Sequence, residues 1–184
     1  MVRRLTLDQK SKVRILVGQP YIGDNMSKIQ ELINDNNTIL VFDVDGTLAK
    51  MEYGDYNHFA LDDDNWNKLI QTGEAYYPDD QAIPCMQEYI KTKDINNIYA
   101  CSKSYSDKED SMKVRFLISA FNIPKDHIYF VRDNDEKLEV LRKIKENRSN
   151  IEDNHIAMVD DSTEVLNHIK ENSNFATIHI SSFM

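Results

Sequence analysis

The sequence predicts an α/β domain in which a mostly parallel sheet lies between two layers of helices. Five short apolar segments of strand length, rich in β-branched residues, alternate along the chain with longer segments of helical period. Strands that are apolar on both faces and joined by single helices form parallel sheets covered on both sides. These observations define a doubly wound, three-layer α/β/α fold of the Rossmann-like type, with a small insertion after the first strand. The predicted strands span 39–43, 97–101, 127–131, 156–160 and 176–180.

Apolar residues at helical spacing predict the helices between these strands. The segment 107–121 begins after Ser106-Asp-Lys-Glu109, a capping-box pattern, and stops before Pro124. Right-handed crossovers then bring the strand-to-helix loops to the carboxyl edge of the sheet, where folds of this kind bind ligands. The predicted helices span about 80–92, 107–121, 134–147 and 162–172, with a further helix near 25–35.

The chain is long enough for one domain with a buried core. It has 184 residues, of which 41% are hydrophobic and 29% are charged, and two ordinary domains need more chain than this. We therefore expect residues 1–184 to form a single domain, with an N-terminal arm and helix over 1–38. Residues 50–79 form an insertion that is too long for a simple connection and too short for a second domain.

Composition argues against several classes of protein. A net charge of −9 disfavours a general nucleic-acid binder, which needs a basic surface to displace counterions. No stretch approaches the roughly 18 to 20 apolar residues of a membrane helix, and no apolar segment follows the basic N-terminus as in a secretory signal. Two cysteines, Cys85 and Cys101, make neither a disulfide framework nor a zinc site. We expect a cytoplasmic protein that does not bind membranes.

The candidate site follows the first predicted strand, in Asp43-Val-Asp45-Gly46-Thr47-Leu48. Two carboxylates two residues apart project from the carboxyl edge, and Gly46 lets the backbone turn and approach a ligand closely. Three later elements bring further polar residues to the same edge. These residues are Ser102, Lys137 and the pair Asp160 and Asp161.

This set of side chains suits phosphoryl transfer. Carboxylates form an oxygen-ligand site for a hard cation, and Mg²⁺ typically takes one or two carboxylates together with water and substrate phosphate. A lysine and a hydroxyl beside them neutralise the equatorial oxygens of a phosphoryl group. One carboxylate remains to act as the nucleophile. The alternative for Asp160 and Asp161 is that they cap the following helix.

Phe42-Asp-Val-Asp-Gly-Thr-Leu48 resembles the first motif of the haloacid-dehalogenase-like (HAD) phosphohydrolase superfamily. Later residues follow the order of that family's motifs: Ser102 after Ile98-Tyr-Ala-Cys101 resembles the second, Lys137 the third, and Met158-Val-Asp-Asp161 the acidic fourth. The resemblance covers residues 39–180, and it implies a HAD-like fold and a Mg²⁺-dependent phosphatase.

The resemblance implies a role for each site residue. Asp43 attacks phosphorus and forms an aspartyl-phosphate. Asp45 protonates the leaving oxygen and then takes a proton from the water that hydrolyses the intermediate. Ser102 and Lys137 hold the phosphoryl oxygens, and Thr47 supports the phosphate-binding loop and the geometry of proton transfer.

The resemblance also implies a site for one Mg²⁺ ion. The ion is held by the Asp43 carboxylate, the Asp45 backbone carbonyl and Asp161, with Asp160 as a direct or water-mediated ligand. Asp45 further indicates phosphate-ester hydrolysis, because relatives that cleave carbon–halogen bonds lack the second aspartate of the first motif. The chain departs from many relatives at Val165, where they carry a further acidic residue.

Residues 50–79 resemble the flap and minimal cap of small family members. The segment 49–56 suits a β-hairpin with Gly54-Asp55 near its tip. The aromatic residues that follow form either a lid that selects the leaving group or a small core packed on the domain. We expect a core position for Phe59 and leave Trp66 and His58 open. With no large cap, the site is either open to bulky substrates or closed by a neighbouring subunit in an oligomer.

We therefore expect a Mg²⁺-dependent phosphomonoesterase whose substrate is a phosphorylated small molecule rather than nucleic acid. A weaker resemblance of 42–51 and 160–165 to the phosphatase domain of polynucleotide kinase-phosphatase enzymes leaves a nucleic-acid 3′-phosphatase as an alternative. Another alternative is a binding or regulatory module that keeps the fold and the Mg²⁺ site without useful turnover, although the intact Asp43 and Asp45 pair argues against it. A phosphotransferase or mutase is also open.

Overall fold

The computed structural model describes residues 21–53, 56–57 and 61–184. Within them, five parallel strands form one sheet in the order β5-β4-β1-β6-β7. All five predicted strands are confirmed, and their ends differ from the predictions by at most two residues. The strands are β1 (Ile39–Phe42), β4 (Ile98–Lys103), β5 (Ile128–Val131), β6 (Ile156–Asp160) and β7 (Ala176–His179).

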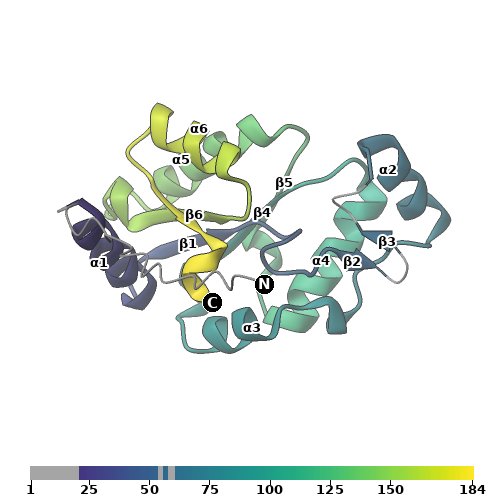
Figure 1. Cartoon of the computed structure of the whole chain (residues 1–184), viewed down its shortest axis with the longest axis horizontal. Helices are drawn as coiled ribbons and strands as arrows, with labels where there is room; N and C mark the ends of the chain where they lie inside the picture. Colours follow the sequence, from purple (N-terminus) through teal and green to yellow (C-terminus); the bar gives the residue numbers. More distant parts are fainter. Residues whose placement is uncertain (1–20, 54–55, 58–60) are drawn as a thin grey trace, which may run out of the picture.

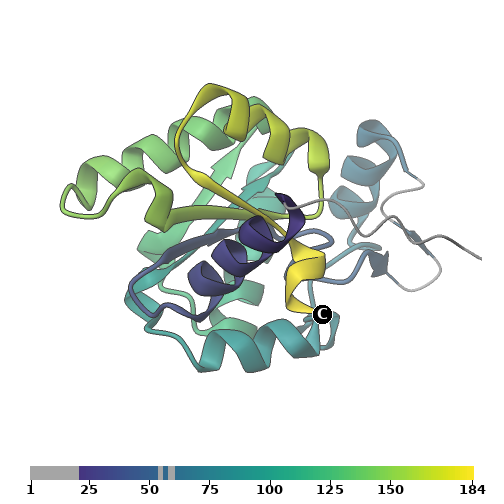
Figure 2. The same cartoon turned by 60° about the vertical axis from the view of Figure 1, so that its left-hand side comes forward.

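Helices cover both faces of this sheet, which confirms the doubly wound α/β/α architecture. Figure 1 shows α5 and α6 on one side of the sheet and α3 on the other, and the turned view in Figure 2 separates the same layers. The helices of these layers are α1 (Tyr21–Asn34), α3 (Pro84–Lys91), α4 (Asp107–Phe121), α5 (Lys137–Asn147) and α6 (Thr163–Asn172). Short 3₁₀ turns span Asp79–Gln81, Ile95–Asn97, Lys125–His127, Asn134–Glu136, Asp153–His155 and Ile180–Phe183.

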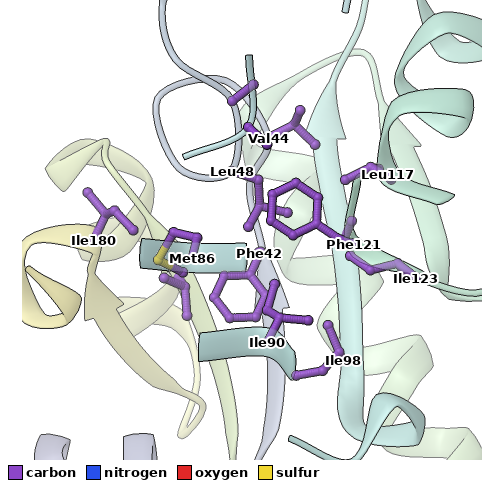
Figure 3. Packing of buried hydrophobic residues seen from close by; sticks show 14 of the residues in the cluster. Phe42, Val44, Leu48, Met86, Ile90, Ile98, Leu117, Phe121, Ile123 and Ile180 are labelled. Carbon is purple, nitrogen blue, oxygen red and sulfur yellow. The ribbon is translucent and has the colours of Figure 1, made fainter. Parts of the chain in front are cut away.

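Alternate residues of each strand face opposite helical layers, as the period of a strand requires. Leu40 and Phe42 of β1 pack with α1, α3 and α4, whereas Ile39 and Val41 pack with α5 and α6. All four side chains are fully buried. In Figure 3 the Phe42 ring lies among side chains from α3 and from the loop that follows β1. The first strand therefore contributes to both hydrophobic cores. The loop that follows it is anchored to a fully buried strand.

Local signals explain where the helices begin and end. The Ser106 hydroxyl accepts from the Glu109 backbone N–H and caps α4, which ends at Asn122 in the left-handed region. Two helices begin later than predicted. Pro84, which needs no N–H partner, occupies the first turn of α3, and the predicted start of α5 is a separate 3₁₀ turn capped by Asp133.

The insertion contains the predicted hairpin and one helix. β2 (Glu52–Tyr53) and β3 (Tyr56–Asn57) pair antiparallel, while the predicted tip, 54–55, lies outside the described residues. The helix α2 (Asp63–Thr72) is capped by Asp62 and lies beside α4 (Figure 1). Trp66 is fully buried in the same core as Phe42. Of the two alternatives left open for Trp66, a lid or a core position, the structure shows the core position. His58, Phe59 and the basic arm over 1–20 lie outside the described residues.

In the part of the chain that the structure describes, no helix combines the length and the apolar character needed to cross a bilayer.

Candidate active site

The site lies between β1 and β6, where the order of the strands along the sheet reverses. β1 and β6 are neighbours, but the chain leaves β1 for the face of α3 and leaves β6 for the opposite face, where α6 packs. Such a switch point leaves a crevice at the carboxyl ends of the strands. A cavity of about 260 Å³ opens here. It is lined by Asp43, Asp45, Asp63, Ser102, Lys103, Tyr105, Glu109, Asn134, Lys137, Asp160, Asp161, Ser162 and Val165.

A tight loop after β1 delivers the first two aspartates. The Val44 carbonyl accepts hydrogen bonds from the backbone N–H groups of residues 47–49 at 2.8–3.2 Å. Gly46 has a φ of 78°, in the left-handed region. A Cβ atom at Gly46 would lie 2.4 Å from Asp161 Oδ2. Two separate features therefore require glycine at this position. One is the left-handed backbone conformation, and the other is the Asp161 carboxylate, which occupies the space that a Cβ atom would need.

Three carboxylates and one lysine form the floor of the cavity. Oxygen atoms of Asp43, Asp160 and Asp161 lie within 4.8 Å of one another. The Lys137 ammonium group donates to Asp43 Oδ1 at 2.8 Å and to Asp160 Oδ2 at 2.9 Å. Lys137, Asp43 and Asp160 are all buried. The topology thus brings together four of the residues predicted from the sequence.

Burial of so much negative charge raises the pKa values of the carboxyl groups. Burial raises the pKa of Asp43 to about 7, and the nearby Asp160 and Asp45 add to this, while Lys137 works against it. Burial, with Asp43 as a further cause, raises the pKa of Asp161 to about 6. Burial also raises the pKa of Asp160. The site holds more negative charge than one lysine neutralises, which is the electrostatic condition for binding a cation.

Ser102 lines the cavity and is held by an unpredicted lysine on α4. The Lys113 side chain is completely buried, and its ammonium group donates to Ser102 Oγ at 3.0 Å and to the Lys103 carbonyl at 2.7 Å. It also pairs with Asp45 Oδ2 at 2.6 Å and with Glu109 Oε1 at 2.9 Å. Burial alone would lower the pKa of Lys113, but the two carboxylates raise it. Lys113 therefore joins Ser102 and Asp45.

Asp45 is held on both of its carboxylate oxygens. Lys113 contacts Oδ2, and the Tyr77 hydroxyl donates to Oδ1 at 2.7 Å. Glu109 stands behind both partners: its Oε1 accepts from Trp66 Nε1 at 3.1 Å and lies 3.4 Å from the Tyr77 hydroxyl. Its Oε2 accepts from a backbone N–H at 2.9 Å. The Ser106 half of the capping-box pattern is therefore present, but the Glu109 carboxylate accepts from the backbone N–H of Tyr105 and not from that of Ser106.

The spacing of Glu109 and Lys113 along α4 is a sequence signal that predicts this buried pair. Glu109 and Lys113 are four residues apart and continue at helical spacing to the buried Phe116 and Leu117. Charged residues on the apolar stripe of a helix are buried with it, and buried charges need partners.

The other cations near the site have different partners. Arg132 makes a bidentate contact with Asp110 at 2.8 and 3.1 Å, and it does not line the cavity. Lys103 lies at the cavity wall, 3.4 Å from Asp63 of α2 and 4.8 Å from the centre of the Tyr105 ring. Lys137 thus contacts Asp43 and Asp160, whereas Lys113 contacts Asp45.

The capping alternative for the acidic pair after β6 is not what the structure shows. Ser162 caps α6, where its hydroxyl accepts from the Val165 backbone N–H. Asp160 Oδ1 accepts from the Ser162 backbone N–H at 2.9 Å while its other oxygen contacts Lys137. Val165, at the position where many relatives carry an acidic residue, presents an apolar side chain to the cavity.

Thr47 occupies a different position from the other predicted residues. Its side chain is completely buried, it is not part of the cavity lining, and Oγ1 has no hydrogen-bond partner among the described residues. A role in phosphate binding for Thr47, and the use of the Asp45 backbone carbonyl as a metal ligand, stay predictions.

The fold and the site together define an α/β domain of Rossmann-like type with an acidic, cation-compatible cavity at the carboxyl edge of its sheet. No protein-family model matches the chain, and no curated protein matches it.

Proposed function

We propose that this chain is a Mg²⁺-dependent phosphomonoesterase that works through an aspartyl-phosphate on Asp43, as its resemblance to HAD phosphohydrolases implies. The observation that supports the proposal most strongly is the arrangement of Lys137 beside Asp43 within a group of three carboxylates. A nucleophile, a phosphate-binding cation and a set of metal ligands then share one cavity, as phosphoryl transfer needs.

The residues present fit a magnesium ion. Mg²⁺ prefers oxygen ligands at about 2.1 Å. One oxygen from each of Asp43, Asp160 and Asp161 lies within 4.8 Å of the others, so the three carboxylates are close enough together to share one ion. When bound, the ion would offset the charge of these carboxylates and polarise a phosphoryl oxygen. The raised pKa values of Asp43 and Asp161 support the same assignment, because groups crowded by like charge gain most from a cation.

The proposed reaction assigns to these side chains the roles that the resemblance implies. An Asp43 oxygen forms a bond to phosphorus while the bond to the leaving oxygen breaks, and Asp45 gives that oxygen a proton. Water then attacks phosphorus, passes its proton to the Asp45 carboxylate and releases phosphate from Asp43. Lys137 and Ser102 stabilise the negative charge of the phosphoryl oxygens during both steps.

The charge of the cavity favours a small phosphate ester over nucleic acid as the substrate. Among the described residues of the lining, the cations are Lys103 and Lys137, whereas six residues carry carboxylates. A nucleic-acid groove needs basic residues that track several phosphates. A substrate with a single phosphate, held by one metal ion, Lys137 and Ser102, suits this lining better than a nucleic acid does.

The experiment that tests the proposal is hydrolysis of an aryl phosphate with and without Mg²⁺, by the native chain and by Asp43→Asn. We expect metal-dependent turnover that falls on the order of 10³-fold in the variant, because the nucleophile is removed. Asp126→Asn, at an exposed position, is the matched control and should keep native activity. Equal activity of native chain and Asp43→Asn would overturn the proposal.

A further inference from the structure

One polar group of the insertion after β1, the Tyr77 hydroxyl, contacts Asp45. Tyr77 is 7% exposed, and its hydroxyl lies 2.7 Å from Asp45 Oδ1. Its ring packs edge-on against Trp66 of α2 and against Phe116 of α4. A tyrosine fixed on both sides by aromatic rings holds its hydroxyl in one place.

The second oxygen of Asp45 is held from α4. Lys113 has four oxygen acceptors around its ammonium group, which include Asp45 Oδ2 and Ser102 Oγ. Glu109 in turn accepts from Lys113 and from the Trp66 indole. The insertion and α4 are therefore joined behind Asp45 by a buried network in which each polar group has a partner.

We propose that Tyr77 and Lys113 are positioning residues for Asp45, so that the insertion contributes to leaving-group protonation through Tyr77. The inference rests on the proposed function, in which Asp45 transfers the proton. Two contacts on two different oxygens fix both the position and the rotation of a carboxylate, and a proton donor must be placed within hydrogen-bond reach of the leaving oxygen. Lys113 also places Ser102, so it couples the proton-transfer group to the phosphate-binding hydroxyl.

The test compares two esters that differ in their need for a proton. An aryl phosphate with an electron-withdrawing ring has a leaving group that departs as an anion, whereas an alkyl phosphate needs protonation of the leaving oxygen. Tyr77→Phe removes one hydroxyl and changes no charge. We expect it to lower kcat for the alkyl phosphate about tenfold or more and to leave kcat for the aryl phosphate within about twofold. KM should stay close to native for both esters.

Tyr76→Phe is the matched control, because Tyr76 is the adjacent residue and is 56% exposed. It should leave both rates unchanged. Equal loss on the two esters in Tyr77→Phe, or no loss on either, would overturn the inference while leaving the proposed function intact. A native chain that hydrolyses neither ester in Mg²⁺ would overturn the proposed function, and the inference with it.

Discussion

Gly46 shows how a single residue position serves both the backbone and the site. Its left-handed φ of 78° is shared by Gly73 at the end of α2, which has a φ of 82°. A Cβ atom at Gly73 would meet no atom within 4 Å, whereas one at Gly46 would collide with the Asp161 carboxylate. The two glycines therefore separate the cost of backbone strain from the cost of displacing the Asp161 carboxylate.

We predict that Gly73→Ala lowers the free energy of unfolding by about 1 kcal/mol through backbone strain alone. Gly46→Ala should lower it further and should also weaken Mg²⁺ binding at least about tenfold, since Asp161 must move. Urea unfolding and isothermal titration with Mg²⁺ measure the two effects. Equal Mg²⁺ affinity in native chain and Gly46→Ala would show that Asp161 is not a ligand.

The raised pKa of Asp43 predicts a pH dependence of stability in the metal-free protein. Burial raises this pKa from 3.8 to about 7, so between these values the folded chain binds a proton that the unfolded chain has released. The contribution of Asp43 is most favourable below about pH 4, declines as the pH rises, and becomes constant above about pH 7.

Asp43→Asn removes this dependence. We therefore predict that the stability of Asp43→Asn relative to the native chain increases between about pH 4 and about pH 7, by on the order of 4 kcal/mol. Urea unfolding in the presence of a chelator, at several pH values, measures the difference. If the free energy of unfolding of Asp43→Asn minus that of the native chain stays constant or falls between about pH 4 and about pH 7, the raised pKa of Asp43 is contradicted.

At the scale of secondary-structure elements, α4 carries a buried charge network on the face that packs against the insertion. Lys113 forms ion pairs with both Asp45 and Glu109, and its side chain is fully buried. We predict that Lys113→Met destabilises the chain by about 3 to 5 kcal/mol, because the buried Glu109 and the half-buried Asp45 lose their cation. Arg115→Met, at an exposed position on the same helix, should change stability by less than about 0.5 kcal/mol.

The double variant Glu109→Gln with Lys113→Met separates charge from packing. We expect it to regain part of the lost stability, because one of the unpaired charges is removed together with its cation. Chemical denaturation of the single and double variants measures this coupling. A double variant less stable than Lys113→Met would mean that Glu109 stabilises the fold independently of the lysine.

Elements with strong local signals were predictable from the sequence. The bounds predicted for α4 agree with the structure because Ser106 caps its start and the chain turns at Asn122 before Pro124. The bounds of α2 were not predicted, because its ten residues contain few apolar side chains and give little apolar period. Trp66 is buried against α4, whose Glu109 lies 43 positions further along the chain, and no local pattern encodes such a contact.

At the scale of the whole molecule, the topology explains why part of the site was predictable. Asp43, Lys137 and Asp160 are separated by up to 117 residues, from 43 to 160, yet all three follow from the rule that parallel strands end at one edge. Tyr77 and Lys113 do not follow from it, because each reaches Asp45 from a helix layer or from the insertion. The alternation of strands and helices predicts the positions of Asp43 and the candidate metal ligands, whereas tertiary packing determines which groups surround Asp45.

The most direct test of the central claim is to look for phosphate on Asp43. Asp45→Asn should slow hydrolysis of the intermediate, because the base that activates water is lost. After incubation with an aryl phosphate and Mg²⁺ and quenching in acid, mass spectrometry of this variant should find one phosphoryl group on the peptide that contains Asp43, and none in the variant that also carries Asp43→Asn. Metal-dependent turnover by the native chain, with no phosphoryl group on Asp43 in the trapped variant, would contradict the account.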